Sequence, residues 1–156
     1  MPLQSSSFQT AVTADILDGQ VTAMDVFDPT EYNEKTSLLE ADDVFDVQLA
    51  WKLTGTATPD VRGSWVVSLY SEAMDGIGMM TGLIAGPVIV RITGDVSPLT
   101  FRLTFRVAPP KPQVGLYKLT ATISHSPTGD PANLSKMSGH AESTPVTIQK
   151  SEVESN

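Results

Sequence analysis

FDVQLAWKLT, residues 45–54, is the stretch that decides the fold of this chain. Apolar residues occupy every second position in it, and these are Phe45, Val47, Leu49, Trp51 and Leu53. Because successive side chains of a β-strand point to opposite faces of a sheet, this period of two predicts a strand with one buried face. Gly55 and the Thr58-Pro59-Asp60 turn end the pattern.

The same alternation recurs downstream of this stretch. It predicts strands at residues 64–70, 99–107 and 117–124, and around Val146 and Ile148. The stretch 84–93 is rich in Val and Ile, and it fits a further strand. Prolines and glycines separate these segments, since proline cannot donate to a strand ladder. Seven or eight short strands joined by turns are typical of a β-sandwich or a β-barrel.

The upstream part of the chain is less regular. Residues 8–14 and 21–27 fit two further strands, and the Asp18-Gly19 dipeptide between them favours a hairpin turn. Residues 30–43 are expected to be mainly loop, with room for a short helix around 31–39. The expected organisation is a disordered N-terminus at 1–7, N-terminal strands with an acidic loop at 8–43, a sandwich core at 44–150 and a disordered tail at 151–156.

Two features resemble immunoglobulin-like and fibronectin-type sandwiches. The segment PPKPQVGLYKL, residues 109–119, has a proline-rich loop leading to Gly-x-Tyr, and in those families the Tyr packs at a corner between sheets. Trp65 resembles their core tryptophan. The resemblance implies an all-β, immunoglobulin-like antiparallel sandwich of about seven or eight strands. The chain has no Cys, which excludes the disulfide-linked type, and a fold of this kind does not specify a function.

Charge is unevenly distributed along the chain. The net charge is −8, and residues 1–50 hold ten Asp or Glu against Lys35 alone, whereas the remainder is close to neutral. An acidic chain is a poor match for nucleic acid or for an anionic membrane surface. The uncharged stretch 77–90 is too short to span a bilayer and contains glycines and a proline. With no leader visible at residues 1–7, a soluble cytoplasmic chain is the default expectation.

The sequence contains only weak matches to catalytic motifs, so we expect that the chain is not an enzyme. The segment GIGMMTG, residues 76–82, differs from the dinucleotide fingerprint in its spacing, and it follows no βαβ pattern. His125 and His140 are expected to be surface or loop residues without a triad around them. Met79 and Met80 are either adaptable apolar filler or part of a loop that docks on a partner.

An acidic cluster near position 43 is a candidate metal site. Asp28, Asp42 and Asp43 could converge on Ca²⁺, which prefers several oxygen ligands, although the chain has no EF-hand spacing. The alternative is a solvated acidic face that aids solubility. No other cofactor is expected.

Two functions remain open at this level. The first is a non-enzymatic assembly module that binds a second copy or another protein through its N-terminal segment and edge strands. The interaction residues predicted for it are Phe8, Val12, Met79, Met80, Arg91, Arg102 and Arg106. In an alternative interpretation, the N-terminal segment and these residues all pack within one monomer, and no partner is needed. The second function is a carbohydrate- or peptide-binding sandwich, assisted by Ca²⁺, although Trp51 and Trp65 both fit the core pattern.

Overall fold

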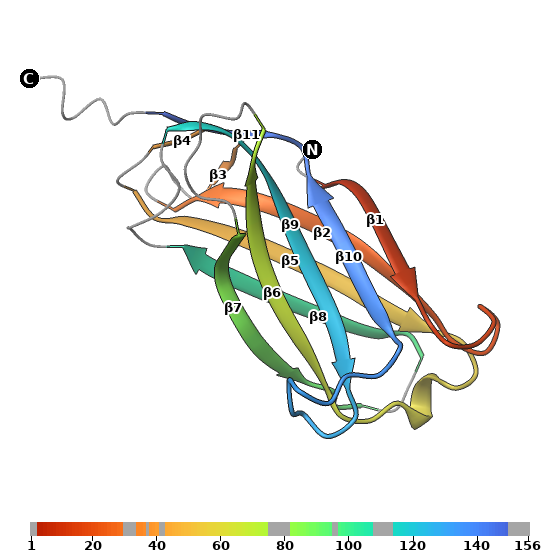
Figure 1. Cartoon of the computed structure of the whole chain (residues 1–156). Helices are drawn as coiled ribbons and strands as arrows, with labels where there is room; N and C mark the ends of the chain where they lie inside the picture. Colours follow the sequence, from red (N-terminus) through yellow and green to blue (C-terminus); the bar gives the residue numbers. More distant parts are fainter. Residues whose placement is uncertain are drawn as a thin grey trace, which may run out of the picture.

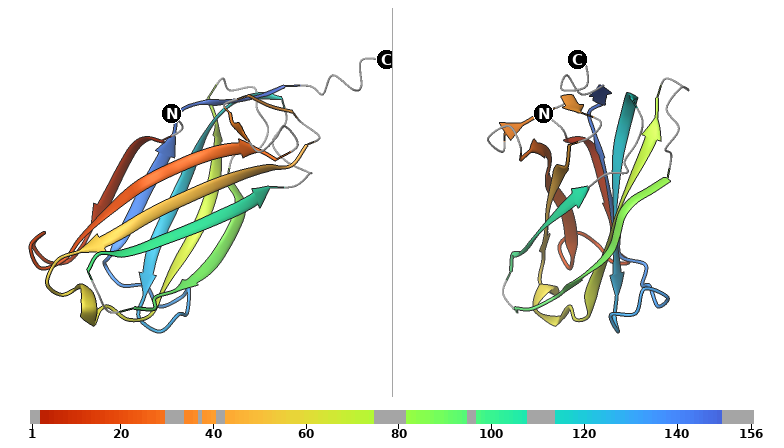
Figure 2. Two further views of the ribbon diagram at one scale, coloured as in Figure 1. Left: turned by 180° about the vertical axis from the view of Figure 1, so that it is seen from behind. Right: turned by 90° about the vertical axis from the view of Figure 1, so that its left-hand side faces the viewer.

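Two β-sheets face each other in a sandwich, as the two layers in Figure 2 show. The computed structural model describes residues 3–29, 34–36, 38–40, 43–74, 82–94, 97–107 and 114–149. Eleven strands lie in these ranges, together with one short 3-10 helix, η1 (Thr58–Asp60). None of the described residues belongs to a helix long and apolar enough to cross a membrane.

Seven strands form the larger sheet, which Figure 1 shows in front. They are β1 (Leu3–Gln9), β4 (Leu38–Glu40), β6 (Ser64–Ala73), β7 (Gly82–Arg91), β9 (Gly115–Ser126), β10 (Ser138–Ser143) and β11 (Val146–Gln149). The long strand β9 pairs with β6 on one side and with β10 and β11 on the other. β1 extends the sheet beyond β10 and β7 extends it beyond β6, so these two strands lie at its edges.

The smaller sheet has the order β3-β2-β5-β8. Its strands are β2 (Asp18–Asp28), β3 (Glu34–Lys35), β5 (Phe45–Thr54) and β8 (Leu99–Val107). Pairing is antiparallel in both sheets except between β11 and β4, which run parallel. The fold is therefore the expected immunoglobulin-like sandwich, with more strands than the seven or eight predicted. The architecture does not single out the fibronectin type.

Aromatic side chains from both sheets meet in the core. Trp51 of β5 stacks on Phe101 of β8 at 5.5 Å between ring centroids, and Trp65 of β6 meets Trp51 edge-on at 6.1 Å. Both indoles are buried, as the alternation predicted, and Tyr117 of β9 is buried as well. Offset and edge-on aromatic pairs add stabilisation beyond the area that they bury.

The N-terminal region differs from the sequence prediction. Residues 3–7, expected to be disordered, belong to β1, and β1 pairs with β10 instead of forming a hairpin with the next strand. Asp18-Gly19 begins β2 rather than making the turn. The cause is the Phe8 ring, which packs on Trp65 at 5.9 Å and fills the space that side chains at Gly19 and Gly139 would occupy.

Two further differences concern short strands. Residues 138–143 form β10, which period-two reasoning missed because small and polar residues conceal its alternating burial. Where a short helix had room around residues 31–39, the described positions form the strands β3 and β4. The expected tail at 151–156 lies outside the described residues.

Candidate interaction surface

The strand β8 forms an uninterrupted open edge of the smaller sheet. It pairs with β5 over its whole length, from Leu99 opposite Leu53 to Val107 opposite Phe45, without a register shift. On its other side, no described residue pairs with it as a strand. A long, regular edge of this kind presents free backbone donors and acceptors to an added strand.

Side chains along β8 alternate strictly between core and solvent. Inward-facing Leu99, Phe101, Phe105 and Val107 are buried. Leu103, at the centre of the strand, also faces inward but is only half-buried. The outward positions are exposed, and they carry Thr100, Arg102, Thr104 and Arg106.

The sequence of β8, LTFRLTFRV, is close to self-complementary when it is reversed about Leu103. A copy running antiparallel in that register would place Phe opposite Phe, Leu103 opposite Leu103, and each Arg opposite a Thr. The pattern arises because the tetrapeptide LTFR occurs twice in succession. This repeat is visible in the sequence alone, and it is the signal that could have drawn attention to Leu103.

Arg106 is held in place by a neighbour on β5. Its guanidinium donates to both carboxylate oxygens of Asp46, at 2.8 and 2.9 Å. This hydrogen bonding, followed by the attraction between the two charges, raises the pKa of Arg106 above its ordinary value. The bidentate geometry restrains the side chain beside the open edge.

A shallow hollow lies on the outer face of the same sheet. It has a volume of about 340 Å³ and is lined by Thr22, Ala50, Trp51, Lys52, Thr100, Phe101 and Arg102. Neither Lys52 nor Arg102 has an ion-pair partner among the described residues. The small side chain of Ala50 leaves room between these two cations.

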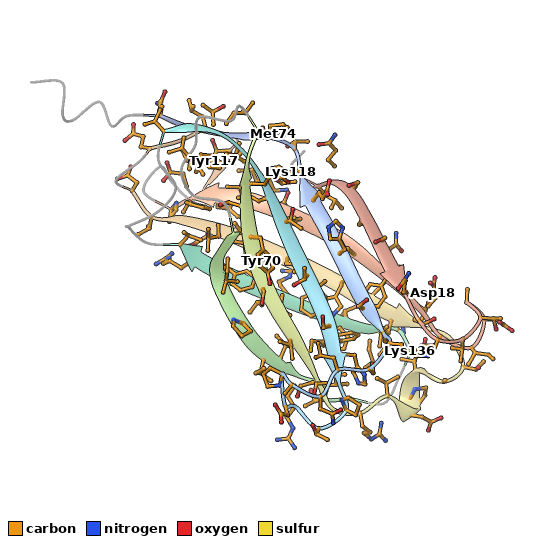
Figure 3. All side chains as sticks on the ribbon, in the orientation of Figure 1. Asp18, Tyr70, Met74, Tyr117, Lys118 and Lys136 are labelled. Atoms are coloured by element: carbon orange, nitrogen blue, oxygen red, sulfur yellow. The ribbon has the colours of Figure 1, made fainter. Side chains whose placement is uncertain are left out.

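The strand β7 forms a second open edge, which is irregular. Its pairing with β6 shifts register twice, on either side of Leu69. Pro87 provides no N–H, and Gly86 has a φ of +92°. Leu83 and Ile89 are 52% and 45% exposed, and the half-exposed Tyr70 lies on β6 next to β7 (Figure 3).

The predicted interaction residues do not form one surface. Phe8 is partly buried and packs against the core, and its role as a contact residue stays a prediction, whereas Val12 is exposed in the turn after β1. Arg102 and Arg106 are neighbours on β8, and Arg91 ends β7. Met79 and Met80 lie outside the described residues.

The calcium site stays a prediction. Asp28 is buried at the end of β2, Asp43 lies just before β5, and Asp42 is outside the described residues. Within the described ranges, no three His, Cys, Asp or Glu side chains gather closely enough to hold a metal ion.

His125 is buried, in contrast to its predicted surface position. The ring lies edge-on to Trp65, with 5.6 Å between centroids, and both nitrogens are within hydrogen-bond distance of a partner. His140 is partly exposed on β10, with Nε2 3.8 Å from Glu142. Since Trp51 and Trp65 are buried as well, neither indole is available to stack on a sugar.

Comparison with solved structures returns proteins of similar topology. The CARDB domain of the PF1109 protein from Pyrococcus furiosus, in complex with di-metal ions, is 16% identical, with a TM-score of 0.49 over 90% of this chain and 95% of that one. A Niemann-Pick type C2 protein from Japanese carpenter ant is 10% identical, with a TM-score of 0.48 over 92% and 99%. A β-glucosidase from Listeria innocua, in complex with glucose, is 10% identical, with a TM-score of 0.43 over 85% of this chain and 16% of that one.

Sequence comparison adds no family. No protein-family model matches the chain, and no curated protein sequence does. At these identities and scores, the similar structures say nothing about what this chain binds.

Proposed function

We propose that this chain is a non-enzymatic assembly module in which β8 pairs with β8 of a second copy. The observation that carries the proposal is the self-complementary sequence of β8 on an open, regular edge. Antiparallel pairing about Leu103 would join two four-stranded sheets into one continuous sheet. A two-fold contact of this kind is closed, so the product is a dimer.

The register matches side chains on both faces of the joined sheet. On the inner face, Phe101 would lie opposite Phe105 of the second copy, and such aromatic cross-strand pairs are favourable. Leu103 would meet its own counterpart, which would cover the one inward-facing side chain of β8 that is half-buried rather than buried. Removing this apolar surface from water supplies part of the driving force.

On the outer face, the register avoids direct contact between like charges. Arg102 would lie opposite Thr104 of the second copy, and Arg106 opposite Thr100. Because Asp46 already holds Arg106 in its own subunit, that guanidinium loses little side-chain freedom on pairing. This arrangement uses an edge strand, as the sequence predicted, but does not use the N-terminal segment. The N-terminal strand is already used within the subunit.

The test is sedimentation velocity over a range of protein concentrations with charge variants at Thr104. Thr104→Glu would place a carboxylate opposite Arg102 of the second copy, whereas Thr104→Arg would place two arginines together. Each change occurs twice in a symmetric dimer, so we expect the first to tighten and the second to weaken dimerisation by about fivefold.

Thr122→Glu is the matched control, because it adds the same charge on β9, in the other sheet. It should leave the dimer unchanged. A monomer at every concentration would overturn the proposal, and so would equal responses to the two Thr104 variants.

A further inference from the structure

A second, more polar hollow is lined by residues where β7 and β9 end and β6 begins. These strand ends lie together at one end of the sandwich (Figure 1). Its volume is about 520 Å³. The lining residues come from three segments of chain, and they are Arg62, Gly63, Ser64, Arg91, Ile92, Pro127 and Thr128. No Asp or Glu is among them.

Ser64 lies at the centre of this arrangement. It pairs with Arg91 of β7 on one side and with Ser126 of β9 on the other, so it shares one face of the sheet with them. Ser64 is only 7% exposed, yet within the described part of the chain its hydroxyl has no hydrogen-bond partner. Its oxygen is not sealed from solvent, because the fully enclosed side-chain atoms without a partner in the described residues are Trp51 Nε1, Thr58 Oγ1 and Trp65 Nε1. The hydroxyl therefore opens into the hollow and can donate to a ligand there.

Arg62 is fixed by three hydrogen bonds. Its Nη1 donates to the carbonyl oxygens of Pro59, at 2.5 Å, and Val61, at 3.0 Å. Its own carbonyl oxygen lies 2.6 Å from Nε2 of His125. A carbonyl oxygen can only accept, so that nitrogen of His125 carries a proton. Nη2 and Nε of Arg62 make no hydrogen bond with any described residue, so they stay available to donate.

The remaining polar groups at the hollow are also donors. Thr128 Oγ1 accepts from the Asp130 N–H, at 3.3 Å, and from Asn133 Nδ2, at 3.2 Å, which leaves its own proton to donate. Arg91 has no ion-pair partner among the described residues. The carboxylate of Asp130, two residues beyond Thr128, accepts from the Ala132 N–H at 2.9 Å.

We infer that this hollow binds an oxyanion group, namely a phosphate, sulfate or carboxylate. Two guanidiniums and two hydroxyls line it, and charge-assisted hydrogen bonds to arginine are the strong ones. The inference is independent of the assembly proposal, because β8 contributes no residue to this hollow.

The test is isothermal titration with inorganic phosphate, with sulfate and with acetate, each at constant ionic strength maintained with chloride. Saturable binding of one anion to the wild-type chain is expected. Tighter binding of phosphate or sulfate than of acetate would assign a tetrahedral ligand group, and the reverse order would assign a carboxylate. Arg91→Gln and Ser64→Ala should each weaken binding by about tenfold.

Arg102→Gln is the matched control. It removes another exposed arginine, one that lines the hollow beside Ala50 instead. Unchanged binding in Arg102→Gln, together with the loss in Arg91→Gln, supports the inference. The inference is overturned if none of the three anions saturates, or if the Arg91 and Arg102 variants lose binding equally. Circular dichroism of each variant confirms that it is folded.

Discussion

The two edge strands β7 and β8 lie on the same side of the sandwich and contact each other, yet they are built in opposite ways (Figure 1). β7 is interrupted by register shifts, by Gly86 and by Pro87, and it exposes apolar side chains. β8 runs without interruption and presents an Arg or a Thr at every outward position.

This difference shows that a sandwich can protect one open edge against the addition of a further strand and leave another edge available for it. Proline and bulges are common means of discouraging strand addition, and charged side chains are another. β7 carries the first kind of protection, which disrupts the backbone pattern itself. The arginines of β8 project from the face of the sheet and leave its ladder of donors and acceptors intact.

The largest expected effect comes from Gly86→Ala, which tests whether the irregular backbone of β7 is required. A Cβ at this position would lie 2.7 Å from the carbonyl oxygen of Val67, at a φ of +92°. We expect a loss of about 3 kcal/mol in the free energy of unfolding, measured by urea denaturation. Gly82→Ala is the control, since its φ is +130° but nothing lies within 4 Å. Gly82→Ala should lose about 1 kcal/mol in the free energy of unfolding. Equal losses in the two variants would show that the close contact with the Val67 carbonyl oxygen is unimportant.

Leu103→Lys tests whether β8, rather than β7, is the edge used in assembly. A charge at the centre of β8 should weaken dimerisation by about 2 kcal/mol, or about thirtyfold in dissociation constant. Ile89→Lys puts the same charge on the exposed apolar part of β7 and should leave the dimer intact. Sedimentation velocity measures the dimer in both variants. If only Ile89→Lys dissociated the dimer, the interface would be assigned to β7.

Asp46→Asn tests the contribution of the ion pair on β8. Replacing this carboxylate leaves Arg106 without its charged partner, and we expect a small loss of stability because Arg106 is largely exposed. Salt screens exposed charges, so the loss should shrink as ionic strength rises. Arg102→Gln, which breaks no ion pair with a described residue, should show no such dependence in parallel thermal melts.

The smallest effect is expected at Thr13→Val, in the turn between β1 and β2. The Thr13 hydroxyl donates to Asp15 at 2.6 Å and lowers the pKa of that carboxyl below its ordinary 3.8. A carboxyl whose pKa is lower in the folded state than in the unfolded state stabilises the fold at pH values above its unfolded-state pKa. That stabilisation is lost as the pH falls through the folded-state pKa. Wild type should therefore exceed the variant slightly at neutral pH, and the difference should vanish in acid. A difference that persists in acid would assign the effect to packing.

Sequence periodicity predicted the central strands well. The alternation at residues 45–54 and 99–107 corresponds to β5 and β8, and Trp51 and Trp65 are buried as expected. It failed at residues 138–143, because Ser, Gly and Ala carry little contrast between a buried and an exposed face. Of the candidate residues, Arg102 and Arg106 do lie together, whereas the partly buried Phe8 packs against the core.

The sequence by itself determined the strands whose apolar residues alternate strongly, such as β5 and β8, and which of their faces are buried, because side chains encode that contrast locally. Only the tertiary structure decided which strands pair. Backbone hydrogen bonds are the same for every residue, so the choice of β10 as the partner of β1 depends on how Phe8 fits beside Gly139. The same holds for the oxyanion hollow, where pairing and turns bring Arg62, Ser64, Arg91 and Thr128 together from distant parts of the chain.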